Sequence, residues 1–317
     1  MAKALFAALL WLPVAAFASC GSAFCSVNTS WDAHGAWLEP GARLDLRYES
    51  IRQDQPRSGR KDIGVGEIRR HHDEVLTLNR NLLAALDYTV NQDWGLNLLV
   101  PIVDRYHEHV HNHGGGQIPE SWNFTELGDM RLMARRRLAS REDANTHTIS
   151  TSALSLGVKL PTGATDVKNA HGDEAERSLQ PGSGTTDFVL GSSYSVALPL
   201  QNLAGFVQGL AQLPMNQADG YRPGHRLNLD LGGRYDLGER LGVLLQFNAL
   251  FKARDQGANA EPEDTGGKFL FASPGLSYAF SRRVQAYGFV QLPLYQDVNG
   301  VQLVARYAFA AGLNTRF

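Results

Sequence analysis

Four histidines recur at every second position after residue 106, and this spacing could bring metal ligands together. They are His107, His109, His111 and His113. On a β-strand, alternate residues share one face at intervals of roughly 6.5 to 7 Å, so the imidazoles would form a ladder. Neutral imidazole nitrogens bind Zn, Cu or Ni, and binding should weaken as the pH falls through about 6.5. His71, His72 or His171 could complete the site from neighbouring loops; the alternative is a solvated polar loop.

The same segment contains a His-Glu-x-x-His pattern from His107 to His111. In metalloproteases this pattern places both histidines on one face of a helix. Here it continues a strand and runs into Gly114 to Gly116, so no such helix is expected. Gly-x-Ser-x-Gly and phosphate-loop patterns are absent, and no His and Ser pair falls on one lipid-facing strand surface, as an outer-membrane phospholipase would need. We therefore predict that the chain is not an enzyme.

The elements that would position these histidines are indicated by the last stretch, residues 301 to 317. Its odd positions are mainly apolar and its even positions include Gln302, Arg306 and Asn314, which is the alternation of a strand with one apolar face. At 17 residues it exceeds the usual strand of about 5 to 6 residues. It resembles the closing strand of bacterial outer-membrane barrels, whose terminal aromatic residue, here Phe317, directs the chain to the barrel-assembly machinery.

Similar alternation predicts further strands along the chain, separated by alternately long and short connections. With residues 301 to 317 there are about twelve, an even number within the range of outer-membrane barrels. We therefore predict an all-β fold, a single antiparallel transmembrane β-barrel over residues 36 to 317, in the outer membrane of a Gram-negative bacterium and with both termini periplasmic. The other predicted strands are residues 42 to 51, 75 to 90, 95 to 103 or beyond, 124 to 138, 149 to 160, 186 to 198, 203 to 213, 227 to 237, 241 to 252, 268 to 280 and 284 to 295.

Residues 1 to 18 have the features of a secretory signal peptide. Lys3 precedes a short apolar run that ends in a small-x-small site before Ser19, and the run is too short to span a membrane. Residues 19 to 35 show no strand period and are expected on the periplasmic side. Cys20 and Cys25, the two cysteines of the chain, are expected to form a disulfide in that oxidising compartment. Lipidation of Cys20, or a thiolate metal site with His34, are the alternatives.

Strand parity also assigns the lumen of the predicted barrel. Charged residues of both signs fall between the apolar, lipid-facing positions, which suggests paired networks in a narrow wet lumen, because unpaired buried charges are costly. The alternative is that these side chains fill and rigidify a closed barrel. The net charge of −2 gives no general basis for nucleic-acid binding. The predicted lumen residues are Arg43, Asp45, Arg47, Glu49, Asp129, Arg131, Arg135, Asp230, Arg234 and Arg306.

Two short segments resemble a known family. Residues 157 to 163 (GVKLPTG) and 126 to 132 (ELGDMRL) are similar to segments of the outer-membrane barrels grouped as transporters of the MetA pathway of phenol degradation. The resemblance implies a channel in contact with outer-membrane lipid that passes a small solute, and it transfers no site residue. Two functions follow as expectations: a channel for small organic molecules or divalent metals captured at a His-rich outer mouth, or a non-conducting structural or metal-binding barrel.

Overall fold

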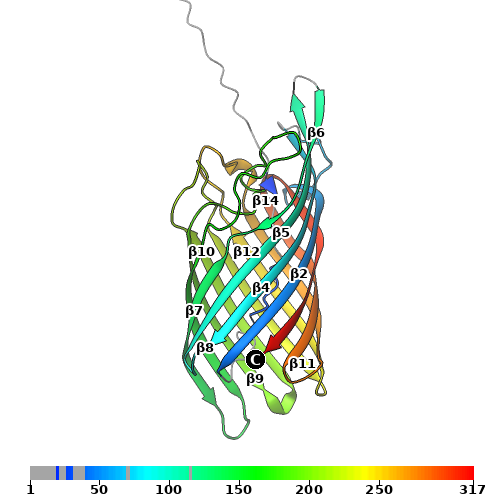
Figure 1. Cartoon of the computed structure of the whole chain (residues 1–317). Helices are drawn as coiled ribbons and strands as arrows, with labels where there is room; N and C mark the ends of the chain where they lie inside the picture. Colours follow the sequence, from blue (N-terminus) through cyan, green and yellow to red (C-terminus); the bar gives the residue numbers. More distant parts are fainter. Residues whose placement is uncertain (1–18, 21–25, 31–39, 69–71, 114–115) are drawn as a thin grey trace, which may run out of the picture.

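The computed structural model describes residues 19 to 20, 26 to 30, 40 to 68, 72 to 113 and 116 to 317. Within these residues the chain is all-β, and its strands close into one barrel (Figure 1). The predicted signal peptide, Cys25, His34 and His71 lie outside the described residues, so the disulfide and the rival thiolate site stay predictions.

The wall of the barrel follows the chain order. Each strand is antiparallel to its neighbours, and β2 pairs with β14 to close the cylinder. The wall strands are β2 (Gly41–Gly59), β4 (His72–Thr89), β5 (Trp94–His113), β7 (Arg131–Glu142), β8 (Ile149–Lys159), β9 (Asp187–Leu198), β10 (Leu203–Pro214), β11 (Arg226–Leu237), β12 (Leu241–Lys252), β13 (Gly267–Ala279) and β14 (Val284–Arg316).

Three further strands extend this wall. β1 (Ser19–Cys20) pairs in parallel with β14, and β3 (Lys61–Asp62) pairs with β2. β6 (Gly116–Leu127) pairs with the far half of β5 and protrudes as a hairpin above the barrel (Figure 1). The strand predicted for residues 95 to 103 or beyond thus continues to His113, because the alternation of residues 105 to 113 extends β5, and β6 begins before the predicted start at residue 124.

The long strand β14 crosses the wall twice. Its first half pairs with β13 and its second half with β2, and the backbone N–H of Arg316 donates to the carbonyl of Arg283 at 2.9 Å. The chain reverses around Gly300, whose φ of 55° suits a residue without a Cβ. Eleven wall strands in the described part of the chain therefore give twelve crossings, as the sequence predicts.

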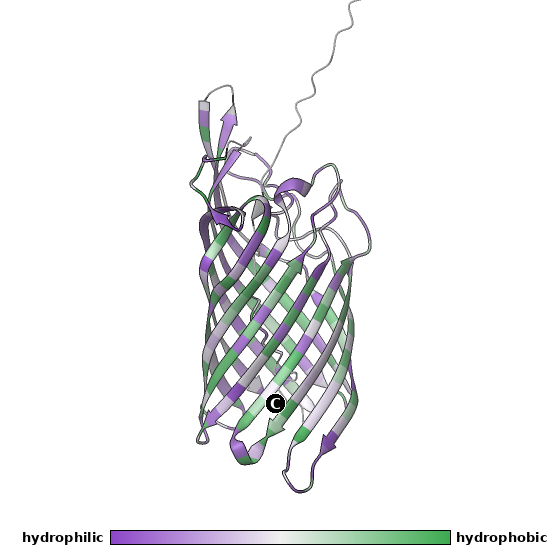
Figure 2. Ribbon diagram, turned by 180° about the vertical axis from the view of Figure 1, so that it is seen from behind, coloured by the Kyte–Doolittle hydropathy of each residue, from purple (hydrophilic) through white to green (hydrophobic). Residues whose placement is uncertain are grey.

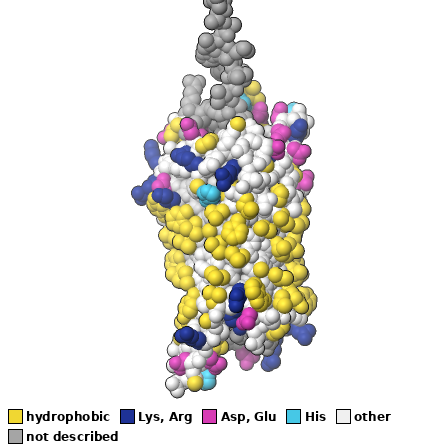
Figure 3. All heavy atoms as spheres, turned by 90° about the vertical axis from the view of Figure 1, so that its left-hand side faces the viewer, with side chains coloured by type: hydrophobic (Ala, Val, Ile, Leu, Met, Phe, Trp, Pro, Cys, Tyr) yellow, Lys and Arg dark blue, Asp and Glu magenta, His cyan; other side chains and the backbone are white. Residues whose placement is uncertain are grey.

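Alternating side chains divide the wall into a lipid face and a lumen face. In β12, for example, Leu241, Val243, Leu245 and Phe247 are exposed, whereas Gln246 and Asn248 are buried inside. Green and purple alternate along the strands in Figure 2, and Figure 3 shows the outward residues as an apolar band between charged rims. An apolar band of this kind is the surface that an outer-membrane barrel presents to lipid. Among the helices described, none is long and apolar enough to cross a membrane.

The connections have different lengths at the two ends of the barrel. Short turns, such as residues 90 to 93 and 238 to 240, lie at the end where the chain finishes (Figure 1). The N–H of Phe317 donates to Ala42 at 2.9 Å, so the barrel starts and ends on this side. Long loops, such as residues 160 to 186, lie at the opposite end, which we take as the outer end.

Candidate functional site

The predicted histidine ladder forms because β5 continues beyond the apolar band. His107 and His109 project from the inward face of β5, and His72 and Glu74 project beside them from β4. Glu176 reaches the same point from the outer loop of residues 160 to 186. Two strands and one loop therefore bring imidazoles and carboxylates together at the outer end of the lumen.

The atoms of this centre are close enough to share one cation. His72 Nε2 lies 3.1 Å from Glu176 Oε1 and 4.0 Å from Glu74 Oε1, and His109 Nδ1 lies 3.8 Å from Glu176 Oε1. The rings of His72 and His109 stack with centroids 4.7 Å apart. One ligand atom from each of His72, Glu74, His109 and Glu176 falls within 4.8 Å of the other three. We call these four residues the His/Glu centre.

Burial controls the protonation of the His/Glu centre. It lowers the pKa of His72 to about 4, although the negative charges of Asp264 and Asp73 act to raise this pKa. It also lowers the pKa of His109 to about 4, and the neighbouring His72 acts in the same direction. Burial raises the pKa of Glu176 well above its ordinary value. Both imidazoles are therefore neutral at neutral pH, which is the form that binds metals.

The donor set of the His/Glu centre fits a borderline divalent metal. Two imidazole nitrogens and two carboxylate oxygens are ligands that Zn accepts in tetrahedral sites at about 2.0 to 2.2 Å, and Cu and Ni also favour imidazole. No hydrogen bond to either carboxylate oxygen of Glu176 is found among the described residues, although the side chain is only 6% exposed. The nitrogens of His72 and His109 lie next to this carboxylate, and a bound cation would be shared between them and Glu176.

The other predicted ligands occupy different positions. His107 Nδ1 forms a hydrogen bond with Thr77 Oγ1 at 2.9 Å, and its Nε2 lies 3.5 Å from Glu74 Oε2. His107 therefore contacts a member of the centre without belonging to it. His111 groups with His109 and Glu120 in a second, more open cluster. His113 belongs to β5, but its side chain is not described. His171, one of three residues that could have completed the site, is exposed, and Glu176 of the same loop contacts His72 instead.

The His-Glu-x-x-His pattern is not helical, as predicted. Residues 107 to 111 belong to β5, so Glu108 points to the face opposite to His107. The hydroxyl of Tyr106 donates to Glu108 at 3.2 Å. The Glu side chain therefore cannot serve a water bound between His107 and His111.

The loop of residues 160 to 186 folds over the outer end of the lumen and covers the centre. Its Ala175 and Leu179 pack against Val103 of β5, Trp122 of β6 and Leu303 of β14. Trp122 Nε1 donates to the carbonyl of Asp173 at 3.0 Å. We call this loop the cap.

A buried charge network anchors the base of the cap. Lys159 Nζ donates to Asp129 at 2.6 Å and to the carbonyl of Thr185 at 2.8 Å, and it lies 3.5 Å from Asp187 Oδ1. The side chains of Lys159, Asp129 and Asp187 are at most 10% exposed. Asp129, a predicted lumen residue, thus holds the cap to β8.

Most predicted lumen residues take part in polar contacts on the inner side of the wall. Arg47 Nε lies 3.1 Å from Glu49, and the Tyr287 hydroxyl donates to Asp45 at 2.8 Å. Arg234 pairs with Asp236 at 2.5 Å, and Asp230 accepts from Asn248 at 2.8 Å. Arg43, Arg131 and Arg135 are half-buried.

Arg306 lies at a break in the strand period. A register shift between Ala305 and Ala308 inserts an extra residue, so Arg306 and Tyr307 are both exposed. Arg306 Nη2 donates to Gln55 at 2.9 Å. Strand parity, which placed Arg306 in the lumen, therefore breaks at this bulge.

The N-terminal segment differs most from expectation. We expected residues 19 to 35 on the periplasmic side, but Ser19–Cys20 pair with Gln302 and Leu303 of β14, and residues 26 to 30 lie inside the lumen. Ser26, Val27 and Asn28 are buried there. Nothing in strand periodicity signals this placement, because the contacts come from single polar side chains of the wall.

Comparison with known proteins places this geometry in context. A family described as "Putative MetA-pathway of phenol degradation" matches residues 73–310. The structure is similar to an outer membrane channel from Pseudomonas putida F1, with a TM-score of 0.65 and 13% identity over 92% of this chain and 100% of that one. The NanC porin gives a TM-score of 0.47 at 9% identity, covering 86% of this chain and 100% of that one. No protein with a curated description matches the chain.

Proposed function

The chain belongs to the family of outer-membrane β-barrels described as the "Putative MetA-pathway of phenol degradation", and on that premise we propose that it is a channel for small solutes that holds a divalent transition metal at its outer end. The family and the closed barrel establish an outer-membrane channel-type fold. The solute and the metal are the proposed part. The family description favours small organic molecules as the solute.

The inner wall supports passage of a small solute. Its buried residues include amides and hydroxyls as well as charges, for example Gln246, Asn248, Ser273 and Gln291. Such groups can exchange hydrogen bonds with a solute at little net cost, because each lost contact is replaced. A wall of this composition suits neutral polar or weakly polar solutes better than ions of one sign.

The single observation that carries the metal proposal is the convergence of His72, Glu74, His109 and Glu176 within 4.8 Å. Three of these residues come from the wall and one from the cap. A metal shared between them would link the cap to β4 and β5. Metal capture would then also stabilise the closed arrangement of the cap, since a ligand that binds one state shifts the population toward it.

Calorimetric titration of the refolded barrel with Zn²⁺ tests this proposal. We expect the double substitution His72→Ala, His109→Ala to abolish binding. The matched control is His171→Ala together with His225→Ala, because both residues are exposed loop histidines and neither belongs to the His/Glu centre. Equal Zn²⁺ affinity in the wild type and the His72/His109 variant would show that the His/Glu centre is only a hydrogen-bonded cluster.

One observation favours the alternative of a barrel that does not conduct. Residues 26 to 30 occupy part of the lumen, and the cap covers its outer end. Conductance in planar bilayers separates the two functions, because a permanently filled barrel gives no current steps.

A further inference from the structure

The histidines at the outer end of the barrel form two sets of metal ligands that share one imidazole. His109 belongs to the buried His/Glu centre and also to a more open cluster with His111 and Glu120, which we call the outer cluster. We propose that the outer cluster is a relay site, where a divalent transition metal such as Zn²⁺ binds first and from which it passes through His109 into the His/Glu centre. This inference rests on the proposed metal binding at that centre and adds the path by which the ion arrives.

The two nitrogens of the His109 ring face different ligand sets. Nε2 lies 3.2 Å from Glu120 Oε2, whereas Nδ1 lies 3.8 Å from Glu176 Oε1. The rings of His109 and His111 have centroids 6.5 Å apart, and those of His109 and His72 stack at 4.7 Å. The ring of His109 therefore stands between the outer cluster and the centre, and it can offer one nitrogen to each of them.

The hairpin of β5 and β6 builds the outer cluster from neighbouring positions. Glu120 of β6 is the register partner of His109, and His111 follows His109 on the same face of β5, two residues nearer the tip. The hairpin protrudes above the barrel (Figure 1). Two imidazoles and one carboxylate form a ligand set that Zn²⁺ accepts while it keeps a fourth position for water. The outer cluster can thus hold a partly hydrated ion.

The exposure of the ligands falls in steps from the outer cluster to the centre. The side chain of Glu120 is 29% exposed and that of His111 is half-buried, whereas those of His109, His72 and Glu176 are 4%, 2% and 6% exposed. An ion must lose its hydration shell before it enters a buried site, and this loss is costly unless protein ligands replace the water. The outer cluster replaces part of the shell at the exposed end, and the centre replaces the rest.

One neutral imidazole serves the two sites in turn, because it has a lone pair on one nitrogen and a proton on the other. While the ion is bound to His109 Nε2, the protonated Nδ1 can donate to His107 Nε2, which is 3.3 Å away. Transfer breaks the metal–Nε2 bond and forms the metal–Nδ1 bond. At the same time Nδ1 gives one proton to water and Nε2 takes one proton from water. The step releases no net proton, and the barrel binds one ion at a time.

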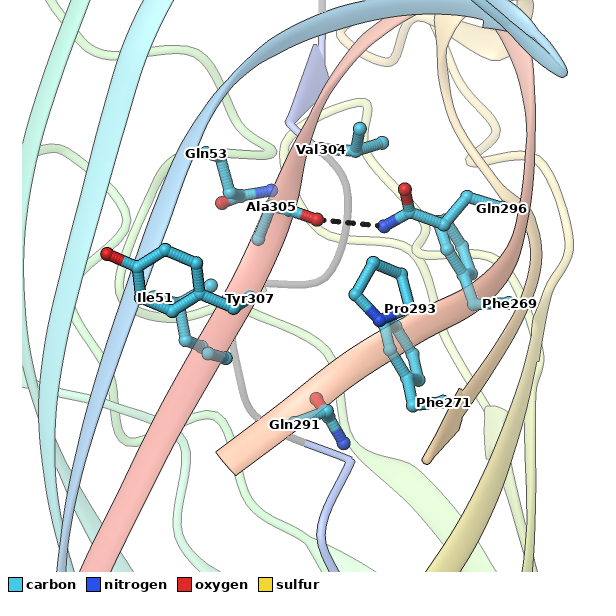
Figure 4. A pocket seen from close by; sticks show the side chains of 11 residues that line it. Ile51, Gln53, Phe269, Phe271, Gln291, Pro293, Gln296, Val304, Ala305 and Tyr307 are labelled. Atoms are coloured by element: carbon cyan, nitrogen blue, oxygen red, sulfur yellow. Dashed lines mark hydrogen bonds between the residues drawn. The ribbon is translucent and has the colours of Figure 1, made fainter. Parts of the chain in front are cut away.

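The path ends at the His/Glu centre. Among the residues that the structure describes, no third set of His, Cys, Asp or Glu side chains brings three ligand atoms within 4.8 Å of one another. The cavity shown in Figure 4, between β2, β13 and β14, is lined mainly by apolar side chains and by the amides of Gln53, Gln291 and Gln296, without an imidazole or a carboxylate. An ion in the centre therefore leaves by the path along which it entered.

A second cavity gives a rival path to the centre. It is lined by residues 63 to 66 and by His72, Asp73 and Glu74. The carboxylate of Asp73 accepts from Asn112 Nδ2 at 2.7 Å. This cavity offers a single carboxylate before the centre, whereas the outer cluster offers two imidazoles and a carboxylate, so the ligands favour the outer cluster. An ion that used the second cavity would bypass His111 and Glu120.

The rate of metal release tests the relay. The refolded barrel is loaded with one equivalent of Zn²⁺ and mixed rapidly with a zinc-sensitive fluorescent chelator, at concentrations where the rate no longer depends on the chelator. The test variant is His111→Ala with Glu120→Gln, and calorimetry gives its Kd. The matched control is His171→Ala with Glu108→Gln, which makes the same changes in the exposed part of the cap and on the opposite face of β5. Heat-modifiable migration in gels verifies that every variant is a folded barrel.

We expect the test variant to keep the Kd of the wild type and to release Zn²⁺ at least about tenfold more slowly, because the ion loses its intermediate ligands and the barrier rises in both directions. The control should release Zn²⁺ at the wild-type rate. Release at the wild-type rate from the test variant would overturn the relay and leave the His/Glu centre intact. A weakened Kd with faster release would also overturn it, because His111 and Glu120 would then belong to the final site. No Zn²⁺ binding by the wild type would overturn the proposed metal centre and the relay with it.

Discussion

The protonation state of the His/Glu centre gives a prediction that the structure makes quantitative. Ordinary histidines with a pKa near 6.5 would lose metal affinity as the pH falls through that value, as expected from the sequence. Burial instead lowers the pKa of both His72 and His109 to about 4. Because protonated imidazole cannot bind metal, the lowered pKa moves the loss of affinity to lower pH.

The perturbation that isolates the histidines is Glu176→Gln, since it removes the carboxyl group whose pKa burial raises. Between pH 7 and pH 5, two ligands with pKa 6.5 would weaken binding about 600-fold through proton competition, whereas two ligands with pKa 4 would weaken it about 1.2-fold. We therefore expect the Zn²⁺ affinity of the Glu176→Gln variant, although weaker than that of the wild type, to be nearly constant over this range.

Calorimetry in buffers of different ionisation enthalpy provides the assay, because it also counts the protons released on binding. At pH 6 the two histidines should release almost none, whereas histidines with pKa 6.5 would release about 1.5. In the wild type we expect release of up to one proton, from Glu176. A loss of affinity of hundreds-fold in Glu176→Gln between pH 7 and pH 5 would refute the buried, neutral centre. His171→Ala, in the exposed part of the cap, serves as the control.

Further predictions concern the cap, the topology and the cysteines. Lys159→Met leaves Asp129 and Asp187 buried without their cation, so the free energy of unfolding in urea should fall by about 3 to 5 kcal/mol; an unchanged urea midpoint would contradict the network. A cysteine at Asn169 should react with an impermeant maleimide on intact cells, and one at Gln92 should not. The reverse pattern would contradict the assignment of the long loops to the outer end. Mass spectrometry of the mature chain should show Cys20 and Cys25 joined; an acylated Cys20 or two free thiols would reject the bridge.

The barrel could be predicted because its signal is local. Alternation of period two is imposed on every crossing by lipid outside and polar groups inside, and β12 shows it without a break. The extension of β5 carries the same alternation, so the inward direction of His107 and His109 could also be predicted from the sequence. Parity is uninformative where the period itself breaks, at the bulge beside Arg306.

The candidate site was only half visible in the sequence. His72 and Glu74 lie two residues apart on one face of a strand, and this spacing is a signal for a pair of ligands. Glu176, in contrast, comes from the cap, and it approaches His109 only because the cap folds back over the outer end of the lumen. The placement of Asn28 against Gln246 has no periodic signal either, because it depends on one side chain facing one peptide group across the lumen.

The conductance of the refolded full-length mature protein in planar bilayers, with the variant lacking residues 26 to 30 beside it, tests the channel most directly. The proposed function predicts discrete current steps, and the variant shows how far residues 26 to 30, which occupy part of the lumen, restrict the current. Silent bilayers for both proteins, each verified as a folded barrel by heat-modifiable migration, would contradict a solute channel and leave the barrel with a structural role.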